Sequence, residues 1–194
     1  MLKRLLLVLA FCLPASAAWA VTLGDDGLHK PEWFSLTFKD IQEDLASARE
    51  EGKRLAIIVE QRGCIYCRKV HEEVLTDPQV RDYIKANFMM VQYDLHGNQE
   101  ITDLDGEVLP EKSAVRKWGV LFTPTILFLP EQADGSRNAA QAAVAAMPGA
   151  FSKGTFLDMF TWVREKRYEG EEDFQRYHAR RIRERAAAGI ENTD

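Results

Sequence analysis

Arg62-Gly63-Cys64-Ile65-Tyr66-Cys67-Arg68-Lys69 contains a Cys-x-x-Cys motif that lies between an apolar run and a helical pattern. The apolar run, residues 55–59, is rich in β-branched side chains and predicts a buried strand of a parallel sheet. Apolar or small residues then recur at intervals of three and four from Cys64 to Leu75, which predicts a helix. We therefore expect both cysteines to lie on one face of the first turn of this helix.

The position of Cys64 at the start of the predicted helix indicates its chemical role. Free N–H groups and the helix dipole favour a thiolate over a thiol at that end. Cys64 is therefore expected to be the attacking sulfur, and Cys67, one turn further on, the resolving thiol. Together they are the predicted catalytic pair and redox-active disulfide.

Two other interpretations fit the same spacing. Cys64, Cys67 and His71 lie at i, i+3 and i+7, so a metal site is geometrically possible, but a structural zinc site needs four ligands and the chain has no second cysteine pair. A purely structural disulfide would close a loop of only two intervening residues, which removes little entropy from the unfolded chain. The redox couple is therefore favoured, and no metal or cofactor is assigned.

The first twenty residues have the pattern of a secretory signal peptide. Two basic residues precede an apolar stretch over residues 5–13, and residues 18–20 form a small-x-small cleavage site. The apolar stretch is too short to span a bilayer, and the phenylalanine before Cys12 poorly matches lipoprotein processing. We expect residues 1–20 to be removed after Ala20 and the rest of the chain to be released into the periplasm.

Cleavage would leave Cys64 and Cys67 as the cysteines of the mature chain. An exported protein with this single close pair has no further disulfide framework to maintain, so the pair is free for exchange. The formal net charge of −5 gives no reason to expect nucleic-acid binding. Residues 21–194 suffice for one core, and no separate dimerisation domain is recognisable, so a monomer is expected.

The rest of the chain predicts helices and strands in alternation. Helices are expected over residues 38–51, after an Asp77 N-cap with Pro78 in the first turn, and over residues 111–118. A second buried strand is expected over residues 89–93 and a hairpin around Asp105-Gly106.

The C-terminal part predicts a closing amphipathic helix and a further charged one. The apolar positions of the closing helix run from Phe156 to Val163, with Phe156, Met159 and Phe160 on one side. Five arginines between residues 176 and 185 are most often a solvated helix face, with a docking role as the weaker alternative. Residues 139–147 are alanine-rich and favour a helix by propensity, but Pro148-Gly149 ends it early, so local signals leave this segment open.

Thr123-Pro124 interrupts a run of strong β formers over residues 120–129. Proline is normally excluded from the interior of a sheet, so this position conflicts with the pattern around it. A cis Thr123-Pro124 bond, which turns the chain just before the strand, would resolve the conflict. An ordinary trans proline that opens the strand is the alternative.

The strand before Cys64-Ile65-Tyr66-Cys67, the Thr123-Pro124 turn and Met147-Pro148-Gly149 before a closing helix together resemble the thioredoxin superfamily. The resemblance covers about residues 36–167. In more detail, three stretches look like the periplasmic thioredoxins of bacterial sulfur-oxidation systems, the SoxW-like type. These are residues 60–64, 100–106 and 116–120.

The resemblance implies an α/β thioredoxin fold, with a central mixed β-sheet flanked by helices, an inserted hairpin and a C-terminal helical extension. The implied organisation is a signal peptide (1–20), a thioredoxin-like domain (21–168) and the extension (169–194). It further implies that Pro124 is cis and packs against the cysteines, and that residues 142–146 form an antiparallel strand.

The implied substrate site contains Thr123, Pro124, Ile65 and Tyr66, with the Thr123 backbone pairing with an extended substrate segment. Two departures concern proton transfer and electron flow. Ile58 stands where thioredoxins place a buried aspartate, which leaves Glu60 as the nearest proton acceptor for Cys67, although a solvated loop carboxylate is the favoured interpretation of Glu60. Ile65-Tyr66 matches neither a reducing nor an oxidising dipeptide of the superfamily, so the motif does not fix the direction of electron flow.

The favoured function is an exported thiol:disulfide oxidoreductase that reduces disulfides of periplasmic proteins. Its partners would be those protein disulfides and a membrane thiol electron donor. The alternatives are a dithiol oxidant of the same fold, a metal-binding module that uses Cys64, Cys67 and His71, and a non-enzymatic binding protein that uses the C-terminal arginines.

Overall fold

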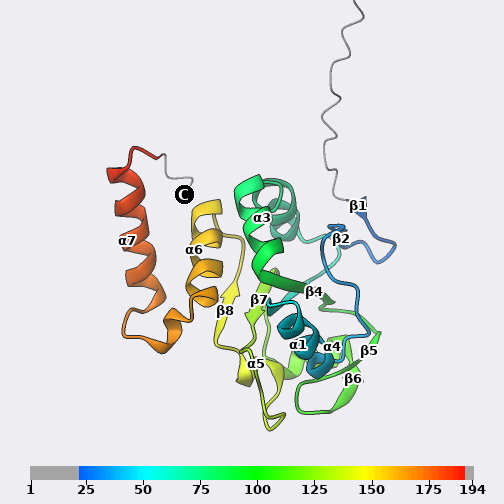
Figure 1. The fold of residues 1–194 in the computed structure, drawn as a ribbon. Coiled ribbons are helices and arrows are strands. Elements are labelled where there is room, and N and C mark those ends of the chain that lie inside the picture. Colours follow the sequence, from blue (N-terminus) through cyan, green and yellow to red (C-terminus); the bar gives the residue numbers. More distant parts are fainter. Residues whose placement is uncertain (1–21, 191–194) are drawn as a thin grey trace, which may run out of the picture.

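The structure, a computed structural model, describes residues 22–190, so the predicted signal peptide and Cys12 lie outside the described residues. A four-stranded sheet with the order β4-β3-β7-β8 forms its centre (Figure 1). The strands are β3 (Arg54–Glu60), β4 (Phe88–Asp94), β7 (Thr125–Phe128) and β8 (Ala145–Pro148). β3 runs parallel to β4 and antiparallel to β7, and β8 runs antiparallel to β7. The predicted mixed sheet is confirmed.

Helices cover both faces of this sheet (Figure 1). One face carries α1 (Ile41–Glu50), α4 (Glu111–Lys117) and α5 (Ala139–Ala142). The other carries α2 (Ile65–Lys69) with its π-helical continuation η1 (Val70–Val74), then α3 (Pro78–Asn87), α6 (Lys153–Arg164) and α7 (Phe174–Ala187). The remaining elements are β1 (Thr22–Leu23), β2 (His29–Lys30), β5 (Glu100–Thr102), β6 (Val108–Pro110) and η2 (Arg167–Glu169). Among residues 22–190, no helix has the length and apolar content needed to cross a membrane.

Strand β3 is buried along its whole length, which explains its continuous apolar sequence. Ile57 and Val59 belong to the core on the α1 and α4 side, whereas Ala56 and Ile58 belong to the core on the α3 and α6 side. Because side chains alternate along a strand, Glu60 shares the face of Ile58. A carboxylate therefore lies at the end of an apolar strand, on the side of the cysteine helix.

Two local predictions are confirmed. Asp77 caps α3 by accepting a hydrogen bond from the N–H of Gln79 at 3.0 Å, and Pro78 is the first residue of the helix. The inserted hairpin forms from β5 and β6, which pair antiparallel on either side of Asp105-Gly106. Gly106 has a φ of 82°, which suits glycine at this turn.

The predicted helix over residues 38–51 is confirmed, but its predicted start at residue 38 is wrong, because α1 begins at Ile41. Asp40 is the N-cap and accepts hydrogen bonds from the N–H groups of Gln42 and Glu43. Before it, Lys39 has a φ of 59°, so the backbone is not helical there, and Phe38 is 93% exposed. Ile41 starts the buried face instead.

The alanine-rich segment, residues 139–147, forms a helix in its first part and a strand in its last part. Asn138 caps α5 by accepting from the N–H of Gln141 at 2.9 Å, and the Gln141 side chain accepts from the N–H of Asn138 at 3.2 Å. This helix ends at Ala142, and β8 then pairs with β7. The implied strand therefore exists, but it begins at Ala145 rather than Ala142 and extends to Pro148.

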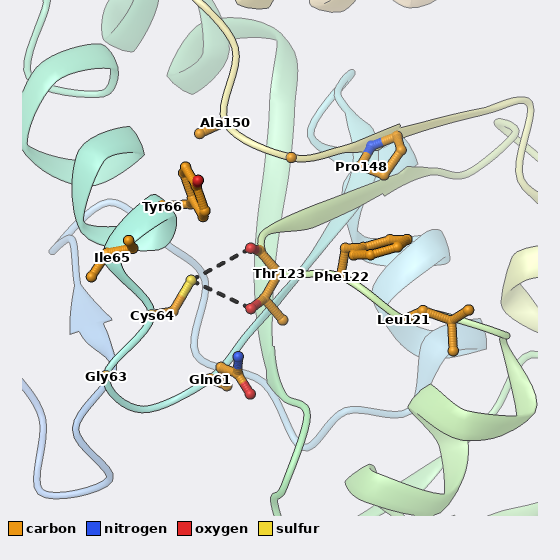
Figure 2. Close-up of a pocket in the computed structure, with 11 residues that line it drawn as sticks. Gln61, Gly63, Cys64, Ile65, Tyr66, Leu121, Phe122, Thr123, Pro148 and Ala150 are labelled. Carbon is orange, nitrogen blue, oxygen red and sulfur yellow. Dashed lines mark hydrogen bonds between the residues drawn. The ribbon is translucent and has the colours of Figure 1, made fainter.

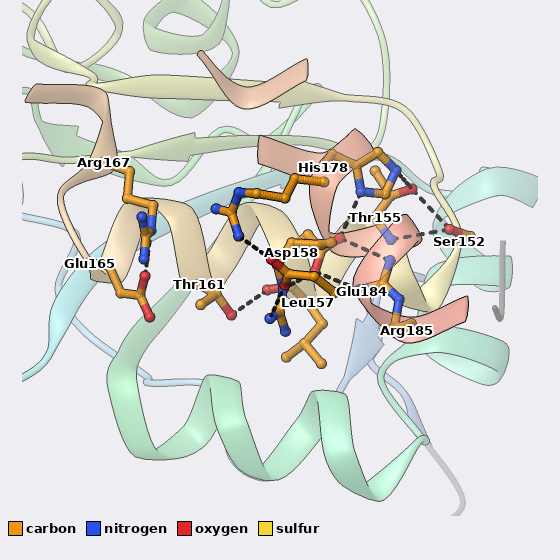
Figure 3. Close-up of polar contacts among 12 residues, drawn as sticks. Ser152, Thr155, Leu157, Asp158, Thr161, Glu165, Arg167, His178, Glu184 and Arg185 are labelled. Carbon is orange, nitrogen blue, oxygen red and sulfur yellow. Dashed lines mark hydrogen bonds and ion pairs between the residues drawn. The ribbon is translucent and has the colours of Figure 1, made fainter. Parts of the chain in front are cut away.

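The C-terminal extension packs on α6 through a buried polar contact as well as apolar ones (Figure 3). Tyr177 of α7 is 2% exposed and belongs to the α3 and α6 core. Arg185 donates to both carboxylate oxygens of the buried Asp158, at 2.8 and 3.0 Å. The interpretation of the arginines as a solvated face is therefore wrong for Arg185, whose side chain is only 16% exposed.

Asp44 of α1 makes the stability of this fold dependent on pH. Burial raises the pKa of Asp44 from 3.8 to about 6, against the opposing hydrogen bond from the Thr37 hydroxyl. Because the folded carboxyl binds its proton more tightly than the unfolded one, stability falls as pH rises from about 4 through 6. Asp44→Asn should remove this penalty and raise the free energy of unfolding by about 1 kcal/mol at pH 7, a value reduced for solvent screening.

Urea unfolding of Asp44→Asn and the wild type at pH 4 and pH 7 would measure this effect. The gain should be close to zero at pH 4, where the folded Asp44 carboxyl of the wild type is protonated and uncharged like the asparagine amide. Glu50→Gln at the end of the same helix is the control, because Glu50 is exposed and should show no such gain. An equal gain at both pH values would contradict the assignment.

Candidate active site

The loop between β3 and α2 brings Cys64 to the start of the helix. Cys64 is the N-cap residue, and its Sγ accepts a hydrogen bond from the N–H of Cys67 at 3.0 Å. Gly63 has a φ of 73°, a left-handed conformation that strains residues with a side chain. Glycine at position 63 is therefore matched to the backbone of this loop.

Cys64 and Cys67 form a disulfide, with their Cα atoms 5.2 Å apart. The two cysteines differ in access to solvent, since Cys67 is only 2% exposed while Cys64 is partly exposed. An incoming sulfur can therefore reach Cys64 from solvent, whereas Cys67 can react only inside the protein. The structure therefore gives the two sulfurs unequal access to solvent.

Thr123 lies directly opposite Cys64, although it is 59 residues further along the chain (Figure 2). Its hydroxyl donates to Cys64 Sγ at 3.3 Å, and its carbonyl oxygen lies 3.5 Å from the same sulfur. The Thr123-Pro124 peptide bond is cis, and Pro124 is buried behind Thr123. The Pro124 carbonyl accepts from the N–H of Gly149 at 2.7 Å, which ties this turn to the end of β8.

A groove of about 550 Å³ surrounds Cys64 (Figure 2). Three segments form its walls: the cysteine loop, the segment before Pro124 and the segment after β8. They contribute Gln61, Gly63, Ile65, Tyr66, Leu121, Phe122, Thr123, Pro148, Gly149 and Ala150. The structure thus brings Ile65, Tyr66 and Thr123 together around Cys64, whereas Pro124 supports the groove from behind.

The groove has an apolar rim that is exposed to solvent. Ile65, Tyr66, Leu121 and Phe122 are between 58% and 79% exposed. Exposed apolar side chains gathered on one face mark a surface for binding another molecule. The structure therefore places Cys64 among exposed apolar side chains.

The interpretation of Glu60 as a solvated carboxylate is wrong. Glu60 is 0% exposed, and His71 Nε2 lies 2.8 and 3.0 Å from its two carboxylate oxygens. The Gln92 side-chain amide also donates to Glu60. His29 of β2 stacks on His71, with ring centroids 4.9 Å apart.

Sequence reasoning missed this buried polar cluster, although two signals for it exist. His71 lies at an apolar position of the cysteine helix, and Gln92 lies within an otherwise apolar strand. Both are polar residues at positions that the pattern predicts to be buried, and buried polar side chains need partners.

The structure also bears on the metal alternative. His71 Nε2 is hydrogen-bonded to Glu60, and the Cys64 and Cys67 sulfurs are bonded to each other, so these atoms are already engaged. Within residues 22–190, no group of three or more His, Cys, Asp or Glu side chains is arranged to hold a metal ion.

Comparison with known proteins gives the family. A model of the thioredoxin-like domain matches residues 41–161. The chain belongs to this thioredoxin-like family. No curated protein matches the chain.

Two solved structures show the same fold. A thioredoxin-fold protein from Helicobacter pylori is 17% identical, with a TM-score of 0.56, over 71% of this chain and 86% of that chain. A thioredoxin from Thermus thermophilus is 23% identical, with a TM-score of 0.50, over 67% of this chain and 88% of that chain. Membership of the thioredoxin-like family, together with the Cys64–Cys67 disulfide, supports the general class of thiol:disulfide oxidoreductases.

Proposed function

We propose that this thioredoxin-like protein is an exported reductase of disulfides in periplasmic client proteins. The observation that carries the proposal is the unequal access to the two cysteines at the helix start. Cys64 opens into the groove beside Thr123, whereas Cys67 is buried behind it. A dithiol-disulfide cycle needs this combination of an accessible nucleophile and a protected resolving thiol.

The reaction consists of two exchanges. The Cys64 thiolate attacks one sulfur of the client disulfide, so a Cys64-client bond forms and the other client sulfur leaves as a thiolate. Cys67 then attacks Cys64, which forms the Cys64–Cys67 disulfide and releases the second client sulfur. The client gains two electrons, and the protein is left oxidised.

The groove suggests how a client is held. An extended client segment can lie along the Thr123 backbone, with its side chains against Ile65, Tyr66 and Phe122. The exposed apolar rim favours clients with apolar residues beside the reactive cysteine, because these contacts remove apolar surface from water. Backbone contacts add little sequence preference, so several clients fit.

The periplasmic location and the direction of electron flow rest on the sequence. The leader-like residues 1–20 favour export, and the stretches that resemble SoxW-like thioredoxins favour a reductase. Reduction of clients requires that the Cys64–Cys67 disulfide be reduced again, for which we propose a membrane thiol carrier. A monomer suffices for this cycle, because one chain supplies both cysteines and the groove.

Trapping with Cys67→Ser tests the proposal directly. Without the resolving thiol, the Cys64-client bond should persist, so the full-length variant in its native cell envelope should be recovered in covalent complexes. Non-reducing electrophoresis followed by peptide mass spectrometry identifies the attached cysteine and its neighbours. We expect periplasmic proteins attached through Cys64, with apolar residues near the attached cysteine.

A variant with serine at both Cys64 and Cys67 is the matched control and should trap nothing. Labelling of free thiols in the same cells reads the direction of flow, since a reductase keeps its pair mostly reduced. A mostly oxidised wild-type pair would favour the dithiol oxidant. The absence of any adduct on Cys64 in the Cys67→Ser protein would contradict the exchange cycle.

A further inference from the structure

The second exchange, in which Cys67 attacks Cys64, needs a proton acceptor. Cys67 must lose its proton to attack Cys64, yet Cys67 is only 2% exposed, so bulk water has little access to it. The acceptor must therefore be a protein group or a water molecule held by one. His71 is the nearest candidate along the helix, since residues four apart lie on the same face.

His71 lies one helical turn after Cys67, on the same face of the cysteine helix. Long side chains on a helix lean toward its N-terminus, over the residues three and four positions earlier. His71 is 0% exposed, so its ring lies in the protein interior, as does the side chain of Cys67. Among the described residues, its Nδ1 is a buried nitrogen with no hydrogen-bond partner.

The hydrogen bonds around Glu60 determine which nitrogen of His71 can accept a proton. Gln92 Oε1 accepts from the ammonium of Lys30 at 2.7 Å, so the Gln92 amide nitrogen faces Glu60 and donates to it. Glu60 is then an acceptor for both neighbours, and His71 donates its Nε2–H to the carboxylate. This arrangement leaves the lone pair of a neutral His71 on Nδ1, the nitrogen without a partner.

The N-terminal segment closes this cluster from outside. The ring of His29 stacks on His71, and the ring of Phe34 lies 5.8 Å from it. The His29 carbonyl accepts from Gln92 at 2.8 Å, which holds the segment to β4. The cluster is thus built from four separate parts of the chain, and its Glu60 and His71 side chains have no access to bulk solvent.

We propose that His71, oriented by Glu60, takes up the proton of Cys67 during resolution of the mixed disulfide. The inference rests on the proposed exchange cycle and assigns its second step. As Cys67 attacks Cys64, its proton moves to His71 Nδ1, directly or through one water, and the client sulfur leaves as a thiolate. The resulting imidazolium is paired with the Glu60 carboxylate, and it returns the proton to Cys67 when the pair is reduced again. Glu60 is the positioning residue, because it acts through His71.

Other charged groups lie around this cluster. Lys30 donates to Gln92, and Arg68 and Glu72 of the cysteine helix act on the His29 ring that stacks on His71. Burial, and to a lesser extent the charge of His71, lowers the pKa of His29, so its stacked ring binds a proton less readily than a solvated histidine does. Glu60 is the acid that contacts the His71 ring.

His71→Gln provides the decisive variant, because glutamine can keep the hydrogen bond to Glu60 but cannot take up a proton. Reduced protein is mixed with a peptide disulfide, quenched with acid at intervals and analysed by mass spectrometry. The rate of attack by Cys64 should stay within about twofold of wild type, whereas decay of the mixed disulfide should slow about 10- to 100-fold at pH 6.5. The slow decay should accelerate about tenfold per pH unit, because only the spontaneously formed Cys67 thiolate reacts.

Glu60→Gln should give a smaller slowing with a shifted pH profile, and Glu73→Gln, a substitution at an exposed acid of the same helix, should change neither step. Wild-type decay rates and pH profile in a folded His71→Gln would overturn the inference, as would equal slowing of both steps at every pH. A wild-type protein that forms no mixed disulfide at all would instead refute the proposed function.

A second measurement on the unaltered chain covers the case in which these variants fail to fold. In protein labelled with ¹⁵N-histidine, the His71 ring signals should respond to titration of the Cys67 thiol in the reduced form and lose this response in the disulfide form. Identical His71 titrations in both forms would overturn the inference.

Discussion

Replacing Cys64 by serine should abolish disulfide reduction, with turnover falling at least about 1,000-fold, because a hydroxyl at this position does not ionise to a useful nucleophile. Cys64 is the sulfur that opens into the groove, and Cys67 cannot replace it because it is 2% exposed. The measurement is steady-state reduction of a protein disulfide with a chemical dithiol as electron donor. Near-ultraviolet circular dichroism establishes that the variant is folded.

Cys67→Ser is the informative comparison for this loss. It removes the same number of sulfur atoms and the same disulfide, but it leaves the accessible nucleophile in place. It should therefore complete one attack at close to the wild-type rate and then stall as a mixed disulfide. Equal first-attack rates in Cys64→Ser and wild type would show that the accessible sulfur is not the nucleophile.

The parts of the fold that follow from local pattern were predictable from sequence. The apolar run before the cysteines formed a strand buried on both faces, and the Asp77-Pro78 signal started a helix at the expected residue. These features depend on residues within one element, so spacing and capping chemistry suffice to predict them. The pairing of Thr123 with Cys64 is different, because it joins segments 59 residues apart and followed from the family resemblance.

The parts that were missed depend on partners distant in sequence. From its sequence neighbours, Glu60 is interpreted as a loop carboxylate, but the structure buries it between Gln92 and His71. From its sequence neighbours, Arg185 is interpreted as a surface arginine, but in the structure it donates to the buried Asp158 of α6. A charged side chain is buried only where the fold supplies a partner, and a local pattern does not identify that partner.

The alanine-rich segment shows the same limit for secondary structure. Propensity favours a helix across residues 139–147, and a helix does form as far as Ala142. The following residues become β8 because β7 offers an unpaired edge, so Ile126 pairs with Met147 and Leu127 with Ala146. Tertiary pairing overrides propensity here.

Asp158→Asn should release the C-terminal helix, because Asp158 is the buried acid that holds α7 on α6 (Figure 3). Arg185 donates to both of its oxygens, and His178 Nδ1 lies 2.7 Å from Oδ2. Loss of one partner from a buried ion pair costs about 3 to 5 kcal/mol. Since α7 lies near the end of the described chain, it can leave its site instead of carrying that cost, so we expect local undocking before global unfolding.

Hydrogen exchange of α7 measures this release, and the expected result is a loss of protection confined to α7 and to the part of α6 that contacts it. Trypsin should also cleave α7 first, at its arginines. Glu184→Gln is the matched control, because it removes one acidic charge from α7 itself but breaks only solvent-exposed pairs with Arg180 and Arg181, which contribute little to stability. If the amide protection of α7 is the same in the Asp158→Asn and Glu184→Gln variants, the buried ion pair does not hold the helix in place. The apolar contacts around Tyr177 would then hold it.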